Sequence, residues 1–196
     1  MILIDEQIQE YTPEEIARWT DELPEWRRKQ VLAYKNDMGR RQSLLAYRLL
    51  CQGLREEYGI MEQPTFVYNE HGKPYIIIKN EKLKIKNVEG LHFSLSHCKE
   101  GVCCAISDRP VGIDIESASR KISDSVIRYS MNEGEQALIR ESDDPQRTFL
   151  RLWTQKEAVL KRLGTGIRDD MRDILSDHAY TIEVRENERY ILSVAW

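Results

Sequence analysis

Two carboxylates interrupt an apolar stretch near the middle of the sequence, in the segment VGIDIE that runs from Val111 to Glu116. Successive side chains of a strand point to opposite faces, so Asp114 and Glu116 would lie on one face and the valine and isoleucines on the other. Acids two residues apart are roughly 6.5 to 7 Å from each other, close enough to repel and to be bridged by one divalent cation. An edge strand would instead leave both acids solvated, and the pattern is compatible with either interpretation.

A second segment with chemical potential is WTQKEAVLK, residues 153–161, in which Glu157 and Lys161 are four residues apart. Residues at this spacing share a helix face, and such a pair is compatible with an ordinary surface ion pair. If this helix packs over the strand that carries the two acids, Glu157 becomes the third carboxylate of an oxygen cage suited to Mg²⁺. Lys161 would then supply a positive charge to a phosphate group in the shell of the ion.

Two shorter motifs could contribute to an anion site. GKP, residues 72–74, is typical of a turn, although Lys73 there could also reach an anion. In FSLSH, residues 93–97, Ser96 and His97 end a predicted strand, where they either serve the structure or donate hydrogen bonds to a phosphate. A serine–histidine nucleophile pair is not expected, because adjacent strand residues point apart.

Helices that would carry or support these motifs are indicated by apolar spacing and capping residues. Thr12, Pro13 and Glu15 form a capping box, and a basic helical region follows Pro24. The run from Arg40 to Tyr58 is predicted as a core helix that ends at Gly59. Further helix starts are predicted at Ser130 with Glu133, and at Asp144 with Pro145 for the longest helix, which ends near Gly164.

Strands are predicted where the apolar period changes to two. Their expected ranges are 2–4, 65–68, 75–78, 91–97, 102–107 and 111–116, followed by a terminal hairpin of 180–185 and 190–196. A break between elements is predicted directly before VGIDIE, at Asp108, Arg109 and Pro110. We therefore expect a midpoint here, with an N-terminal half of residues 1–108 and a C-terminal half of residues 109–196.

Composition narrows the functional class. The 196 residues are 41% hydrophobic and 32% charged, as in folded globular proteins. No segment approaches ~18 consecutive apolar residues, and the start MILIDEQIQE lacks the regions of a signal peptide, so we expect a cytoplasmic protein without membrane segments. The net charge of -4 argues against broad nucleic-acid binding. The basic segment RRKQ, residues 27–30, together with Arg40 and Arg41, forms either a solvated helix face or an anion site.

The cysteines do not have the spacing of a zinc site. Cys51, Cys98, Cys103 and Cys104 include no CxxC pair, and structural zinc usually takes closely spaced ligand pairs. Two histidines lie nearby in the sequence, at 92 and 97. Buried reduced thiols are nevertheless the expected state of these residues.

In chain order, GKP, FSLSH, VGIDIE and WTQKEAVLK followed by GTGI strongly resemble the motifs of 4′-phosphopantetheinyl transferases of the surfactin-synthetase-activating type. The matches run from about Arg27 to Ile167. The resemblance implies an enzyme that moves the phosphopantetheine arm of coenzyme A to a serine of an apo acyl or peptidyl carrier protein, releasing adenosine 3′,5′-bisphosphate. A non-catalytic module of the same fold that binds coenzyme A or a carrier is the alternative.

The resemblance also implies roles for single residues. It makes Asp114, Glu116 and Glu157 the ligands of Mg²⁺, and Glu157 and Lys161 the catalytic pair. It further implies a set of residues that bind the coenzyme: Lys73, Pro74, Ser96, His97, Lys29, Arg41 and Lys156. Two positions depart from the family pattern: Trp26 stands where a basic residue is often found, and Gln42 where a small hydroxyl residue is often found.

The implied architecture is α+β, with two similar halves packed as a pseudo-dimer in one chain and the coenzyme in the cleft between them. Because that cleft is internal, a monomer is expected. The resemblance implies a carrier protein and coenzyme A as partners, without nucleic acid or membrane. A magnesium nuclease with Asp followed by Glu-x-Lys is disfavoured, because Glu116 is followed by Ser117 and Ala118.

Overall fold

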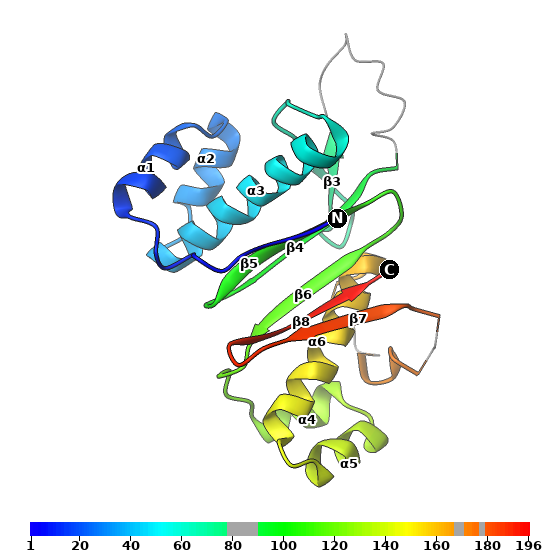
Figure 1. The fold of residues 1–196 in the computed structure, drawn as a ribbon. Coiled ribbons are helices and arrows are strands. Elements are labelled where there is room, and N and C mark those ends of the chain that lie inside the picture. Colours follow the sequence, from blue (N-terminus) through cyan, green and yellow to red (C-terminus); the bar gives the residue numbers. More distant parts are fainter. Residues whose placement is uncertain (78–89, 167–170, 177–178) are drawn as a thin grey trace.

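The computed structural model describes residues 1–77, 90–166, 171–176 and 179–196, arranged as a mixture of helices and antiparallel strands (Figure 1). In chain order the elements are β1 (Ile2–Asp5), α1 (Pro13–Asp21), α2 (Glu25–Leu32), α3 (Asp37–Tyr58), β2 (Thr65–Tyr68), β3 (Pro74–Ile77), β4 (His92–Cys98), β5 (Gly101–Ser107), β6 (Gly112–Ser117), α4 (Asp124–Ser130), α5 (Glu133–Glu141), α6 (Pro145–Leu163), η1 (Met171–Asp173), β7 (Ile182–Glu186) and β8 (Tyr190–Ala195). The predicted α+β class is thereby confirmed. Within the described ranges, no helix is both long and apolar enough to cross a bilayer.

The first sheet has the strand order β1-β5-β4 and is covered on one face by α3. Alternation along β5 explains this packing: Val102, Cys104 and Ile106 join the leucines of α3 in one apolar cluster. Cys103 and Ala105 point the other way and belong to a different cluster. All four cysteines are free, and Cys98, Cys103 and Cys104 are buried as predicted, whereas Cys51 is only half-buried.

The second sheet has the order β6-β8-β7 and is covered by α6. In both sheets the first strand along the chain pairs with the last strand, and the last pairs with the one before it. All the pairings in both sheets are antiparallel. The two sheets therefore share one topology, each with a long helix inserted between its first strand and its final hairpin.

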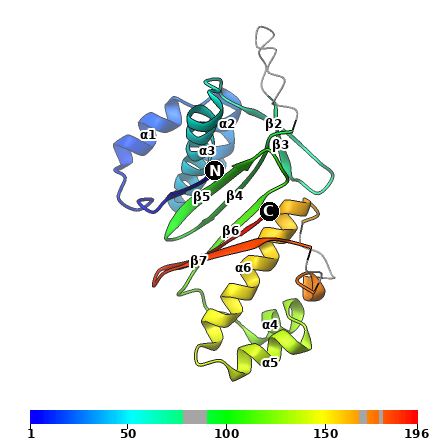
Figure 2. The same ribbon diagram turned by 45° about the vertical axis from the view of Figure 1, so that its right-hand side comes forward.

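The two sheets pack on each other, so the order of layers is α3, first sheet, second sheet, α6 (Figures 1 and 2). Their shared core combines Cys103 and Ala105 with Ile113, Leu192 and Val194. The edge strands β4 and β6 are joined by serine hydroxyls, since Ile113 N donates to Ser94 Oγ at 3.1 Å and Ile115 N to Ser96 Oγ at 3.4 Å. These hydroxyls satisfy backbone donors of an edge that would otherwise remain unpaired.

Most of the predicted helix signals are confirmed. Thr12 and Glu15 form the expected capping box, α3 ends at the left-handed Gly59, and Asp144 caps α6. The prediction that Ser130 begins a helix is wrong. The capping box of α5 is formed by Asn132 and Glu135, two residues later, whereas Ser130 is the last residue of α4 and its hydroxyl donates to Val126 O.

The strand predictions agree with the structure to within a residue or two. β2 and β3 pair as a hairpin, and β7 and β8 form the expected terminal hairpin. Ile78, which was predicted to end a strand, and Ile167 of the GTGI motif lie outside the described residues.

Candidate active site

Gly112, the glycine of VGIDIE, brings α6 into direct contact with β6. A Cβ atom built on Gly112 would lie 1.9 Å from Ala158 O and 2.4 Å from Arg162 N, both backbone atoms of α6. The helix thus rests on the bare backbone of the strand. This close approach places Glu157 and Lys161 beside Asp114, which lies on the same face of β6 as the glycine.

Asp114, Ser96 and Lys161 form a hydrogen-bonded triangle at the junction of the two sheets. Lys161 Nζ lies 2.6 Å from Asp114 Oδ1 and 2.8 Å from Ser96 Oγ, and Ser96 Oγ donates to Asp114 Oδ1 at 2.8 Å. Although burial opposes the charged form, the charge of Asp114 and its hydrogen bond raise the pKa of Lys161. The lysine is therefore held as a cation whose position is fixed from three elements, β4, β6 and α6.

Glu116 and Glu157 complete a group of three acids. Burial, and then the charge of Asp114, raise the pKa of Glu116 to about 7 and also raise that of Glu157. Arg120 forms an ion pair with Glu116 and lies over the ring of Trp153, 5.0 Å from its centroid. Three carboxylates thus share two cations, Lys161 and Arg120, and the remaining negative charge is what a bound cation would neutralise.

The donor atoms suit a hard cation such as Mg²⁺. Asp114 Oδ2 and Glu157 Oε1 are buried and have no hydrogen-bond partner. Buried carboxylate oxygens are normally paired, so two orphaned oxygens from facing elements fit an ion that accepts oxygen ligands. In the described parts of the chain, no three His, Cys, Asp or Glu side chains are already grouped closely enough to hold a metal. The three-ligand metal site therefore stays a prediction.

A cavity of about 330 Å³ lies beside this cluster, within the usual size range of small-molecule sites. Its lining joins Glu157 and Lys161 of α6 with Lys73 and Pro74 of the β2–β3 hairpin. Phe93 and Leu95 of β4 and Leu160 of α6 supply apolar walls. Four residues that were singled out from separate motifs thus border one cavity.

His97 lies near the cluster, at the end of β4. Its side chain is exposed, and burial of part of the ring, followed by the charge of Lys161, lowers its pKa. Gln42 Nε2, from the start of α3, donates to the adjacent Cys98 O at 3.0 Å. Trp26 packs edge-on against Tyr47 and Phe66 in the first half.

Lys156, Lys29 and Arg41 are not brought to the cluster. Lys156 is fully buried, and its Nζ pairs with Glu135 Oε2 at 2.8 Å and donates to the carbonyls of Met171 and Arg172. Lys29 forms an exposed ion pair with Glu25. The Arg41 side chain pairs with Asp37 and donates to the carbonyls of Tyr11 and Ile8, which ties the segment before α1 to α3.

The position of Lys156 leads to a prediction about stability. Replacing it by methionine would leave Glu135 buried without its cation, and breaking a buried pair in this way costs about 3 to 5 kcal/mol. We expect the urea midpoint of Lys156→Met to fall accordingly. The double variant Glu135→Gln/Lys156→Met removes the stranded charge and should regain part of the loss. Equal midpoints for wild type and Lys156→Met would refute the role of this pair.

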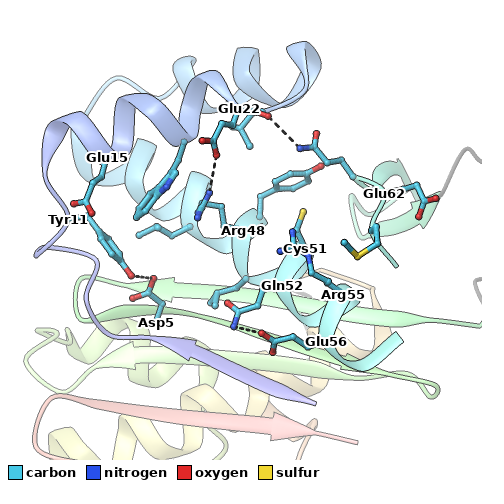
Figure 3. A pocket seen from close by; sticks show the side chains of 17 residues that line it. Asp5, Tyr11, Glu15, Glu22, Arg48, Cys51, Gln52, Arg55, Glu56 and Glu62 are labelled. Carbon is cyan, nitrogen blue, oxygen red and sulfur yellow. Dashed lines mark hydrogen bonds and ion pairs between the residues drawn. The ribbon is translucent and has the colours of Figure 1, made fainter. Parts of the chain in front are cut away.

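A larger cavity, of about 570 Å³, lies between α1 and α3, away from the acids (Figure 3). Several of its polar groups contact one another: Tyr11 donates to Asp5, Gln52 donates to Glu56, and Arg48 lies over Trp19 and pairs with Glu22. It contains none of the residues that the motifs pointed to. Its size alone therefore does not make it the reactive site.

Sequence reasoning missed several residues that shape the site. Arg120 was not singled out, although its spacing of four residues from Glu116 is visible in the sequence. Ser94, within FSLSH, was not singled out, because the bond that its hydroxyl accepts from Ile113 N depends on how the two sheets meet. Asn69, which contacts the end of α6, gave no signal beyond that of an ordinary turn residue.

Three acids, a fixed lysine and an adjoining cavity bordered by a second lysine are the features expected of a class of site for an anionic ligand and a cation. Residues 110–194 match the family model described as the 4'-phosphopantetheinyl transferase superfamily. The predicted resemblance is confirmed, and this segment belongs to that superfamily.

Curated relatives agree with the family match. The chain is 31% identical over 144 residues to the 4'-phosphopantetheinyl transferase gsp of Aneurinibacillus migulanus, covering 72% of this chain and 56% of that protein. It is 34% identical over 131 residues to psf-1 of Bacillus pumilus, covering 65% and 52%, and 32% identical over 104 residues to Sfp of Bacillus subtilis strain 168, covering 52% and 42%. The matches thus span about half the length of these relatives.

Proposed function

We propose that this protein is a 4′-phosphopantetheinyl transferase, which transfers the phosphopantetheine group of coenzyme A to a serine of an apo acyl or peptidyl carrier protein. The observation that carries this proposal is the junction of Asp114, Glu157 and Lys161 beside a cavity that Lys73 also lines. The relatives named as 4'-phosphopantetheinyl transferases support it. The reaction forms a bond between the serine oxygen and the β-phosphorus and breaks the bond from that phosphorus to the oxygen bridging the two phosphates, which leaves with adenosine 3′,5′-bisphosphate.

Each residue of the site has a part in this reaction. Glu157, whose pKa is raised by burial and by the charge of Asp114, accepts the proton of the carrier serine as it attacks. Lys161, held in place by Asp114 and Ser96, stabilises negative charge on the phosphates. Lys73, Pro74 and His97 border the coenzyme, while Lys29 and Arg41 are proposed as more distant contacts to its 3′-phosphate. Lys156 stabilises the helix that carries the catalytic pair.

Asp114, Glu116 and Glu157 are proposed to hold Mg²⁺. The buried oxygens of Asp114 and Glu157 that have no partner support two of the three ligands. Glu116 would give up its ion pair with Arg120 to bind the ion. A bound Mg²⁺ would neutralise pyrophosphate charge and orient the phosphate for in-line attack. We further propose that residues 1–108 and 109–196 are two halves of a pseudo-dimer, which the shared strand order of the two sheets supports.

The test is mass spectrometry of a panel of apo carrier proteins incubated with the protein, coenzyme A and Mg²⁺. A mass gain of one phosphopantetheine on the carrier serine, abolished by a chelator, is the expected result. Binding of coenzyme A or carrier without any mass gain would instead support the non-catalytic module. The intact acids at 114, 116 and 157 favour the enzyme, since a binding module has no need of them.

Metal binding gives a prediction that does not depend on turnover. We expect Mg²⁺ to raise the melting temperature, because the ion binds only where folding brings the acids together. At tenfold excess over its Kd the stabilisation is about 1.4 kcal/mol, or roughly 3 to 6 °C for a chain of this length. Differential scanning fluorimetry should show this shift for wild type and lose it in Asp114→Asn. An equal shift in that variant would contradict the assignment of Asp114.

A further inference from the structure

The turn that joins β2 and β3, residues 69–73, lies against the C-terminal end of α6. Lys73 Nζ donates to Arg162 O at 2.7 Å, and Asn69 Nδ2 donates to Gly164 O at 2.9 Å. Carbonyls at the end of a helix lack partners within the helix. Two of them are therefore satisfied by side chains from the other half of the chain.

Asn69 also builds the turn from which it reaches. Its Oδ1 accepts from Lys73 N at 2.8 Å and from His71 N at 3.0 Å, and Asn69 N donates to Lys73 O. One amide group thus uses its oxygen to shape the 69–73 turn and its nitrogen to contact α6.

Gly164 makes the close contact possible. It ends α6 in the left-handed conformation, with φ of 73°, and a Cβ atom there would lie 2.5 Å from Lys73 Cδ. The turn therefore sits directly on the helix end. Gly164 lies about one helical turn beyond Lys161. Lys73 and Gly164, which contact each other, line the same cavity as Lys161 and Glu157.

The geometry points to Asn69 as a positioning residue of the transfer reaction. By fixing the end of α6 to the 69–73 turn, it would hold Lys161 and Glu157 at the correct distance from Asp114 and from the coenzyme. This inference rests on the proposed function and adds a residue that does not itself touch the reacting atoms. Misplacement of catalytic groups by about 1 Å can lower the rate about a hundredfold, so fixing the end of α6 is expected to increase kcat.

Asn69→Asp isolates this role, because aspartate keeps the oxygen that the turn needs and loses the donor to Gly164 O. We expect kcat for carrier modification to fall about tenfold while KM for coenzyme A stays within about threefold. Asn187→Asp is the matched control: Asn187 Oδ1 likewise accepts from two backbone amides, those of Arg189 and Tyr190, in the β7–β8 turn. That control should keep wild-type kinetics. An unchanged kcat in Asn69→Asp, or an equal fall in the control, would overturn the inference.

Hydrogen exchange separates the failure of this inference from the failure of the proposed function. The amide of Gly164, which donates to Leu160 O, should exchange about tenfold faster in Asn69→Asp and in Asn69→Ala. Unchanged exchange would refute the contact itself, whether or not the protein transfers phosphopantetheine. Faster exchange with unchanged kcat would show a merely structural contact and overturn the positioning role. If wild type modifies no carrier, the proposed function fails, and with it this role for Asn69.

Discussion

Replacing Glu157 by glutamine is expected to lower kcat for carrier modification by about a hundredfold to ten-thousandfold, the usual contribution of a general base. The amide keeps the shape of the side chain but can neither accept the serine proton nor bind a cation with a charged oxygen. Steady-state transfer to an apo carrier, followed by mass spectrometry, measures the effect. Full activity of Glu157→Gln would rule out the proposed role.

The same variant should be at least as stable as wild type. Burial and the charge of Asp114 raise the pKa of Glu157, which means that ionising this carboxyl costs more free energy in the folded state than in the unfolded chain. A neutral amide of the same shape removes that unfavourable charge. Loss of rate at an unchanged or higher melting temperature would therefore mark a residue kept for chemistry. Glu188→Gln, in the exposed turn between β7 and β8, is the control and should change neither quantity.

Local sequence patterns predicted the elements of the site well, because the relevant rules act over a few residues. Alternation along VGIDIE placed Asp114 and Glu116 on one face of a strand. The spacing of four residues placed Glu157 and Lys161 on one face of a helix. Asp144 and Gly164 bounded the helix that carries them. The failure at Ser130 has an equally local cause: two overlapping capping signals stood two residues apart, and the structure uses the later one, Asn132.

Contacts between the halves could not be predicted in this way. The bond from Ile113 N to Ser94 and that from Asn69 to Gly164 O join residues that are far apart in the sequence. Lys156 shows the same limit, although its neighbour Glu157 lies close enough to Asp114 to feel its charge. Lys156 is one residue earlier on the helix, and its ammonium group contacts Glu135 and the carbonyls of Met171 and Arg172 instead. Such assignments need the packing of α5 and η1.

The glycine of VGIDIE connects the fold to the chemistry. Asp114 and Lys161 meet at 2.6 Å only because α6 lies directly on the backbone of β6 at Gly112. Any side chain at this position would separate the helix from the strand. The Cβ of alanine would lie 1.9 Å from Ala158 O, whereas real Cβ atoms essentially never come within 3.0 Å of another atom. The obstructing atoms belong to backbone, so a change of rotamer cannot relieve the clash.

Gly112→Ala is therefore expected to destabilise the protein by about 3 kcal/mol, at the upper end of the usual cost of overpacking. Because α6 must shift, kcat should also fall by about a hundredfold. Urea unfolding and carrier modification measure the two effects. Gly134→Ala in α5 is the matched control, since its Cβ would meet only Asn132 Oδ1 at 3.5 Å, and it should gain up to about 1 kcal/mol. A Gly112→Ala protein with the wild-type midpoint and kcat would show that this close approach is not required.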